Sequence, residues 1–141
     1  MKQSEKRGKN NKIGAIGEDL ATRFLMERGH TIVDRNYLKK WGEIDIVSRE
    51  TKENKEIVHF VEVKTVSYET IVNLEQAVSY GTWRPEENVH HEKIRRLSRV
   101  IESWLLEKKI TSDWQIDVVS VRIVPRDKYS TIKYLPNITL T

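Results

Sequence analysis

Cysteine is absent from this chain of 141 residues, and so are long hydrophobic runs. Without cysteine there are no disulfides and no thiolate metal ligands, which excludes a disulfide-stapled domain and a cysteine zinc site. No apolar stretch approaches the roughly 18 residues needed to span a membrane. The first residues are basic but lack the apolar segment of a secretory signal. We therefore expect a cytoplasmic protein with no membrane partner.

The net charge of +4 comes from the N-terminus. Residues 1–12 carry five basic side chains and one acidic side chain, and the rest of the chain is neutral overall. This polar segment has no apolar periodicity, so we expect a disordered basic tail over residues 1–12 and a single domain over residues 13–141. Such a tail can add salt-sensitive phosphate contacts, although we favour a solubilising role.

Hydrophobic periodicity predicts both helices and strands in the domain. Apolar residues recur at helical spacing over residues 13–28, and Gly14 and Gly17 lie within the apolar arc, which suggests close packing of this helix on a sheet. Further helices are predicted at 73–80 and 86–108, and strands at 31–37, 43–48, 57–65, 114–124 and 131–135. The polar residues 49–56 are typical of a hairpin loop. This order predicts an α/β (α+β) fold, with a mixed sheet flanked by helices.

Charged residues follow two of the predicted strands. Glu62 and Lys64 end an apolar run, and alternation along a strand puts both side chains on one face. Glu43 and Asp45 would share a face of the preceding strand in the same way. If the two strands form a hairpin, carboxylates and one ammonium group converge at the end of the sheet.

This set of side chains is typical of a metal-dependent nuclease. Asp45 and Glu62 can hold Mg²⁺, which binds through one or two carboxylates and keeps several waters. Lys64 can stabilise the charge that develops on a phosphate or orient the attacking water. Glu18, on the first predicted helix, adds a third acid. The alternative is a solvent-facing ion pair between Glu62 and Lys64 on an edge strand.

A resemblance to a known family rests on several motifs in the same order: Gly14 to Ala21, Gly29, Asn36-Tyr37, Gly42 to Ile46, and Phe60 to Thr65. Together they resemble the YraN-type family of bacterial proteins. That family is assigned to the restriction-endonuclease-like, PD-(D/E)xK nuclease superfamily and is similar to archaeal Holliday-junction resolvases. The resemblance implies an αβββαβ core, a divalent metal and nuclease activity on DNA.

By position, the resemblance assigns roles to four residues. Glu18 matches the acid on the helix, Asp45 the acid on the first strand of the site, and Glu62 and Lys64 the Glu-x-Lys pair. The chain departs from the family at Val66, where members often have arginine, so one expected phosphate contact is missing. Asp117 also matches a family aspartate, and we expect it to have a structural role.

Five further positions are weaker candidates. Glu43 can join the site, or it can anchor the start of its strand. Lys93 and Arg96 can bind nucleic-acid phosphates, and a solvated basic helix face is the alternative. Gln76 and Tyr80 echo a Gln-x-x-x-Tyr element of RecB-like nucleases, although local helix contacts explain this spacing equally well.

The sequence therefore predicts an endonuclease that depends on Mg²⁺ or Mn²⁺ and hydrolyses phosphodiester bonds in DNA, with branched or junction DNA as a candidate substrate. Two alternatives stay open: a non-catalytic nucleic-acid-binding or assembly module on the same fold, and a nuclease directed at RNA. A homodimer is expected if the substrate has two-fold symmetry, because paired cuts need paired sites.

Overall fold

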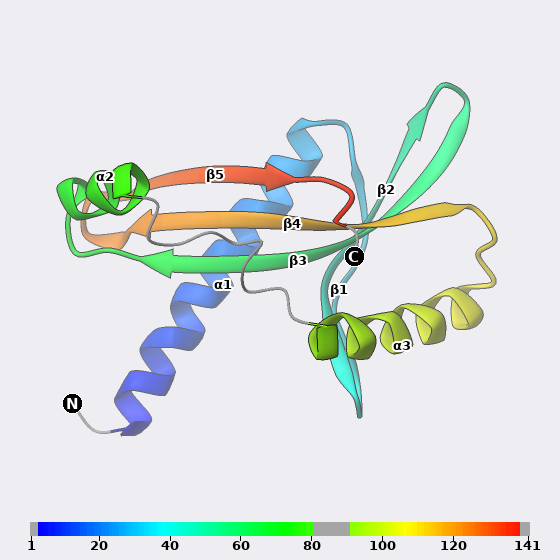
Figure 1. Ribbon diagram of the computed structural model, residues 1–141, viewed down its shortest axis with the longest axis horizontal. Helices are drawn as coiled ribbons and strands as arrows, with labels where there is room; N and C mark the ends of the chain where they lie inside the picture. Colours follow the sequence, from blue (N-terminus) through cyan, green and yellow to red (C-terminus); the bar gives the residue numbers. More distant parts are fainter. Residues whose placement is uncertain (1–2, 81–90, 139–141) are drawn as a thin grey trace.

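The computed structural model describes residues 3–80 and 91–138, with side chains for residues 11–79 and 95–138. In this part of the chain a five-stranded sheet has α1 on one face and α2 and α3 on the other (Figure 1). The elements are α1 Gln3–Glu27, β1 Thr31–Lys39, β2 Gly42–Lys52, β3 Lys55–Ser67, α2 Ile71–Tyr80, α3 His91–Lys108, β4 Asp113–Val124, a short 3₁₀ helix Pro125–Asp127, and β5 Tyr129–Leu135. No helix within these ranges is long and apolar enough to cross a membrane.

The strand order is β1-β2-β3-β4-β5, so strands that follow one another in the chain are also neighbours in the sheet. β3 and β4 are parallel, and the other three neighbouring pairs are antiparallel. The connection between β3 and β4 contains α2 and α3, as a parallel pair requires a crossover segment. The predicted mixed sheet and α+β class are therefore confirmed.

The predicted start of the first helix is wrong. α1 begins at Gln3 rather than residue 13, so this helix includes residues 3–12 of the segment that was expected to be a tail. Lysine, glutamine, glutamate and arginine propagate a helix readily once it has been nucleated, and the packed part of α1 supplies the nucleus. The N-terminal turns project past the sheet (Figure 1). Residues 86–90, predicted to open the long helix, lie outside the described ranges.

The predicted hairpin loop at residues 49–56 is instead a continuation of the ladder. β2 and β3 pair as far as Lys52 and Lys55, and only Glu53 and Asn54 form the turn. Both turn residues have positive φ, 53° and 66°, as in the two-residue turns that match strand twist. The polar composition of this segment reflects exposure of the hairpin on both faces and not an irregular backbone.

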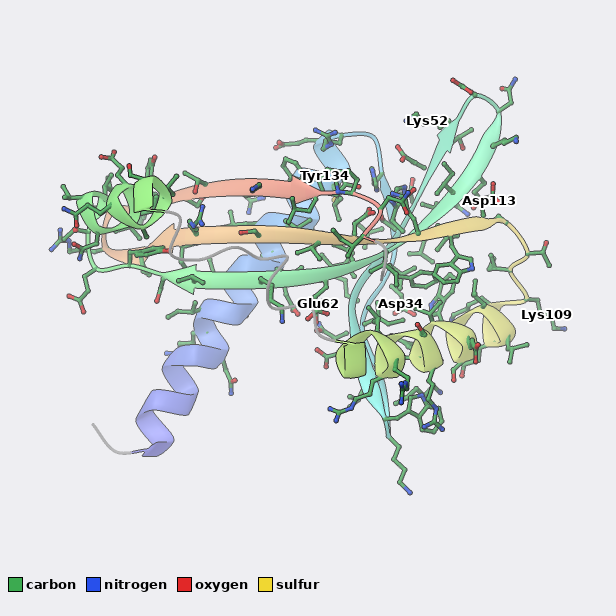
Figure 2. The ribbon with its side chains drawn as sticks, in the orientation of Figure 1. Asp34, Lys52, Glu62, Lys109, Asp113 and Tyr134 are labelled. Atoms are coloured by element: carbon green, nitrogen blue, oxygen red, sulfur yellow. The ribbon has the colours of Figure 1, made fainter. Side chains whose placement is uncertain are left out.

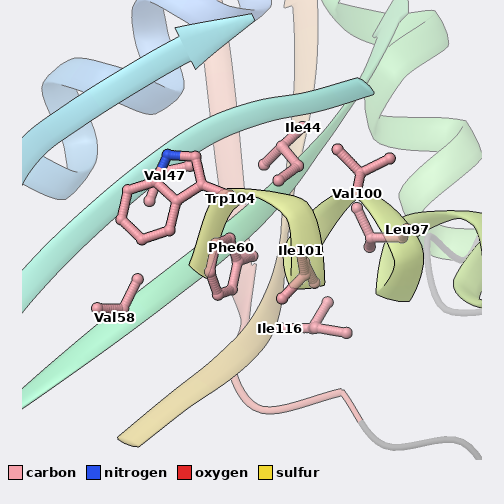
Figure 3. Packing of buried hydrophobic residues seen from close by; sticks show 9 residues of the cluster. All are labelled: Ile44, Val47, Val58, Phe60, Leu97, Val100, Ile101, Trp104 and Ile116. Carbon is pink, nitrogen blue, oxygen red and sulfur yellow. The ribbon is translucent and has the colours of Figure 1, made fainter. Parts of the chain in front are cut away.

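Each face of the sheet has its own hydrophobic core. Under α3, the ring of Phe60 meets Trp104 edge to face at a centroid distance of 5.4 Å, and Figure 3 shows these residues with Ile101 and Val100 above β2 and β3. On the opposite face, α1 contributes Ala21 and other apolar side chains that pack on β3, β4 and β5. The sheet is thus fixed from both sides.

Gly17 is the point at which α1 comes closest to the sheet. A Cβ atom built on Gly17 would lie 1.8 Å from the Thr65 hydroxyl oxygen, a distance that no real contact allows. Gly14, one helical turn earlier, has nothing within 4 Å of the equivalent position. The predicted close packing is therefore confirmed for Gly17 and wrong for Gly14.

Replacing these two glycines should change stability in opposite directions. Gly17→Ala should lower the free energy of unfolding by about 1–3 kcal/mol, because α1 must move off β3 to admit the methyl group. Gly14→Ala is the matched control and should raise it by up to about 1 kcal/mol, since alanine is the better helix former. Urea denaturation followed by circular dichroism measures both, and equal effects of the two substitutions would contradict the close approach.

Candidate metal and nucleic-acid site

Asp45 lies where β2 and β3 separate. Backbone pairing between these strands runs from Lys52 and Lys55 to Ile46 and Val61 and then stops. Beyond that point, Asp45 Oδ2 accepts a hydrogen bond of 2.8 Å from the backbone N–H of Val63. The carboxylate thus takes the place of a strand partner, which fixes its position at the fork of the hairpin.

The backbone of β2 is irregular at the same residue. Ile44 and Val47 face the core under α3, whereas Ile46 faces the core under α1, so the regular alternation is interrupted around Asp45. Opposite Asp45, the ladder with β1 passes over Asn36, which has a φ of 53°. The strand predicted over residues 31–37 includes Asn36 and continues to Lys39. The side chain of Asp45 can therefore approach α1 as well as β3.

Glu18 reaches this fork from α1. Its carboxylate accepts a hydrogen bond of 3.2 Å from the side-chain amide of Asn36, with the amide oriented so that its nitrogen faces Glu18. Arg35 lies 3.8 Å from the same carboxylate and 3.0 Å from Asp19. Arg35 was not among the predicted site residues. The one feature of the sequence that points to it is its position directly before the Asn36-Tyr37 motif.

Glu18, Glu43 and Asp45 form one group of carboxylates, with one oxygen from each lying within 4.8 Å of the others. Burial, the charges of Glu62 and Glu18 and a hydrogen bond with Glu43 together raise the pKa of Asp45 to about 8, against the opposing effect of the hydrogen bond from Val63. Burial also raises the pKa of Glu18, against the opposing charge of Arg35. Without a bound cation, the carboxyl groups of this site are therefore not all ionised at neutral pH.

Glu62 and Lys64 lie on the face of β3 that carries α3, as the alternation predicted. Lys64 Nζ is 3.1 Å from Glu62 Oε1, and both side chains are mostly buried, with 23% and 14% of their surfaces exposed. Glu62 lines a cavity of about 260 Å³ together with Glu43 and Asp45. Because the side chains of Glu62 and Lys64 are both mostly buried, the alternative of an ion pair in open solvent does not hold, even though β3 has no β2 partner at these two residues.

The cavity also has a basic and aromatic wall. Arg96 of α3 and Trp41, between β1 and β2, line it together with the acids. The guanidinium of Arg99 lies over the Trp41 ring, 5.1 Å from its centroid. A Cβ on Gly42 would be 3.1 Å from Val100, so the absence of a side chain at this position lets α3 approach the fork. Arg96 therefore lies at the site, as predicted.

The other accessory positions are not brought to the fork. Gln76 is exposed on α2, which lies at the far end of the sheet from α3 (Figure 1). Gln76 is not among the residues that line the cavity of Glu43 and Asp45. The side chains of Lys93 and Tyr80 lie outside the part of the chain for which side chains are described.

The family of this chain is identified by its similarity to known proteins. A model of the uncharacterised protein family UPF0102 matches residues 17–121, which include the acids of the fork. The chain belongs to the UPF0102 family. The YraN-type family resemblance predicted from the sequence is thereby confirmed.

Relatives within UPF0102 match nearly end to end. A UPF0102 protein of Dictyoglomus turgidum is 33% identical over 129 residues, covering 91% of this chain and 97% of the relative. One of Alkaliphilus oremlandii is 39% identical over 131 residues with the same coverage. A UPF0102 protein of Rhodococcus opacus is 37% identical over 115 residues, 81% of this chain and 85% of the relative.

The raised pKa of Asp45 makes the stability of this UPF0102 chain dependent on pH. A carboxyl whose pKa is raised on folding, here from 3.8 to about 8, stabilises the fold when protonated. That contribution is complete below pH 4 and is lost as the pH rises toward 8. In a chelating buffer, the free energy of unfolding should therefore fall between pH 4 and pH 8.

Asp45→Asn should remove most of this slope, because the amide stays neutral. At pH 8 the variant should be more stable than the wild type by roughly 1 kcal/mol or more, since each pKa unit corresponds to about 1.4 kcal/mol. Urea denaturation at both pH values measures the difference. Asp113→Asn, at an exposed aspartate, is the control and should keep the wild-type slope. An unchanged slope in Asp45→Asn would refute the assignment.

Proposed function

We propose that this UPF0102 chain is a metal-dependent endonuclease that hydrolyses phosphodiester bonds in DNA. The observation that carries the proposal is the fork of β2 and β3, where the Asp45 carboxylate replaces a strand partner and Glu18, Glu43 and Glu62 gather around it. Burial holds the pKa of Asp45 and of Glu18 above its usual value, and such acids gain most from a divalent cation. No purely structural role explains why these acids are clustered.

The carboxylates fit a hard divalent cation. Two oxygens on opposite sides of one Mg²⁺ lie about 4.2 Å apart, so oxygens from Glu18, Glu43 and Asp45 within 4.8 Å of one another need only small adjustments. Glu62, predicted to be the second ligand, is outside this group of three and lines the adjoining cavity. We therefore assign Asp45 as the central metal ligand and Glu62 as a further ligand that reaches the ion from the wall of the cavity. A bound Mg²⁺ or Mn²⁺ would supply a nucleophilic water and offset phosphate charge.

The remaining residues have separate tasks. Lys64, held by its ion pair with Glu62, presents a positive charge beside the acids and can stabilise charge that develops on the scissile phosphate. Glu62 fixes the direction of that ammonium group. Asn36 and Arg35 hold the Glu18 carboxylate at the fork. The positions of these groups are set by the fold before substrate binds, which limits the reorganisation needed during reaction.

A nucleic acid is the phosphodiester substrate that the surroundings favour. The exposed Arg96 of α3 lines the acidic cavity, and the exposed Arg99 lies over the Trp41 ring in the cavity wall. Lys40 is exposed at the nearby β1-β2 turn. Cations on the rim of an acidic centre can contact backbone phosphates on either side of the cut. We propose DNA as the substrate, with branched or junction DNA as the form to test first.

Metal binding should depend on the fork. Calorimetric titration of the wild type with Mn²⁺ should give saturable binding, and Asp45→Asn should weaken it at least tenfold, because the central carboxylate is lost. The variant should remain folded, since its neutral side chain removes buried charge. Wild-type protein that binds neither Mn²⁺ nor Mg²⁺ would favour a non-catalytic nucleic-acid-binding module.

Cleavage should require Lys64. With a panel of linear, single-stranded, flapped and four-way DNA substrates and with Mg²⁺ present, Lys64→Ala should lower the cleavage rate about 100-fold or more, as for the loss of one charge-stabilising group. DNA binding in the presence of Ca²⁺ should change little. Lys55→Ala, at the exposed start of the same strand, is the matched control and should cleave like the wild type. Equal cleavage by both variants would refute the role of Lys64.

A further inference from the structure

A second cluster of titratable side chains lies on the α1 face of the sheet, near the base of the β2-β3 hairpin. His30 follows α1, Glu50 is on β2 and His59 is on β3. Both histidines are buried, with 6% and 2% of their surfaces exposed. Figure 2 shows that Tyr134 and Lys52, which border this cluster, lie well away from Glu62 at the acidic site.

The two imidazole rings direct the same nitrogen toward one carboxylate. His59 Nε2 is 2.8 Å from Glu50 Oε1, and His30 Nε2 is 3.6 Å from Glu50 Oε2. One ligand atom from each of the three residues lies within 4.8 Å of the others. Ligands about 2.0–2.1 Å from a tetrahedral zinc ion lie roughly 3.3 Å apart, so the two observed separations bracket the spacing that zinc requires.

The other ring nitrogens are held by polar groups behind them. His59 Nδ1 is 2.6 Å from Asp117 Oδ2, and His30 Nδ1 is 2.8 Å from Ser48 Oγ. Histidine ligands of metals are usually oriented in this way, with the second nitrogen bonded to a carboxylate or other acceptor. Asp117, expected to be structural, therefore fixes the ring that faces Glu50.

The hydrogen bonds around Asp117 determine which nitrogen of His59 carries a proton. The buried carboxylate of Asp117 accepts hydrogen bonds from the Gln115 amide, the Tyr134 hydroxyl and the backbone N–H of Asn137. With three donors already directed at it, the carboxylate of Asp117 is also the acceptor in its contact with His59. The Nδ1 of His59 must then be the donor.

A neutral His59 ring would consequently point the lone pair of Nε2 at the Glu50 carboxylate. Two acceptors 2.8 Å apart repel, so the contact needs a cation between them, either a second proton on the ring or a metal ion. A second proton on His59 would satisfy the His59–Glu50 contact but would leave His30 Nε2, 3.6 Å from Glu50 Oε2, beyond hydrogen-bond distance. A metal ion satisfies all three side chains at once.

We propose that His30, Glu50 and His59 bind one transition-metal cation of the zinc type, at a site separate from the carboxylates of the fork. Imidazole nitrogens favour Zn²⁺ over Mg²⁺, whereas the all-oxygen fork favours the harder ion, so the two sites would select different metals. The cluster opens onto a cavity of about 410 Å³, with Arg28 and Lys52 on its wall. A fourth ligand, water or a small anion, would enter from this side.

Zinc titration of the full chain, dialysed free of metal, tests the proposal. The wild type should bind Zn²⁺ saturably at one site of this kind, and the imidazole ¹⁵N resonances of His30 and His59 should shift together with the bound fraction. Glu50→Gln should weaken binding at least tenfold. Ser48→Ala, which frees the His30 ring, should weaken it about tenfold, the lower limit for loss of a supporting group.

Two control variants separate this site from other places where zinc can bind. The double variant His90→Gln/His91→Gln removes the other two histidines of the chain and should keep wild-type zinc affinity. Asp45→Asn should keep zinc binding while losing Mn²⁺ at the fork, so failure of either site can be recognised independently. The histidine resonances report binding in the wild type even if a variant does not fold.

Three outcomes would overturn the proposal: no zinc binding by the wild type, affinity unchanged in Glu50→Gln, or resonance shifts confined to His90 and His91. In each of these cases the His59–Glu50 contact is a proton-bridged structural pair.

Discussion

The hydrogen bond from the Val63 N–H to the Asp45 carboxylate is the constraint on which the candidate site depends. It lets β2 leave β3 without an unsatisfied buried amide, and it holds an acid where the strands part. The neighbouring acids then raise the pKa of Asp45 further. The repulsion and burial of these acids thus lower the stability of the fold, and a bound cation would offset that loss. Stability and function oppose each other here, as they commonly do at functional sites.

Much of the fork could be predicted from the sequence because strands have a period of two. Glu62 and Lys64 follow an apolar run, and their common face in the structure follows from that alternation. The same alternation placed Glu43 and Asp45 on one face of their strand, and helical periodicity located the first helix, which carries Glu18. Hydrophobic periodicity also gave the element order and the mixed sheet, since burial on one or both faces dictates where apolar residues recur.

The rest depends on contacts that periodicity does not encode. The irregular backbone at Asp45 and the positive φ of Asn36 have no clear signal in the sequence. The sequence therefore predicted Asp45 and Glu62 as the metal ligands, and it did not predict the group formed by Glu18, Glu43 and Asp45. The histidine cluster joins the residue that follows the Gly29 turn to both strands of the β2-β3 hairpin, and its support by Asp117 comes from β4. Its one sequence signal was a titratable residue, His59, inside an apolar run. The polar composition of residues 49–56 likewise predicted a long loop, whereas only Glu53 and Asn54 form the turn of the hairpin.

The neighbour-to-neighbour strand order gives the two polar centres different histories during folding. Every acid of the fork lies between residues 18 and 62, within one helix and two consecutive hairpin ladders, so it can assemble through short chain closures. His30, Glu50 and His59 also lie close together in the chain, but the His59 ring is held in place only when β4 brings Asp117 alongside β3 after the long crossover. The first centre is thus complete once local topology has formed, and the second gains its supporting carboxylate only when the crossover has closed.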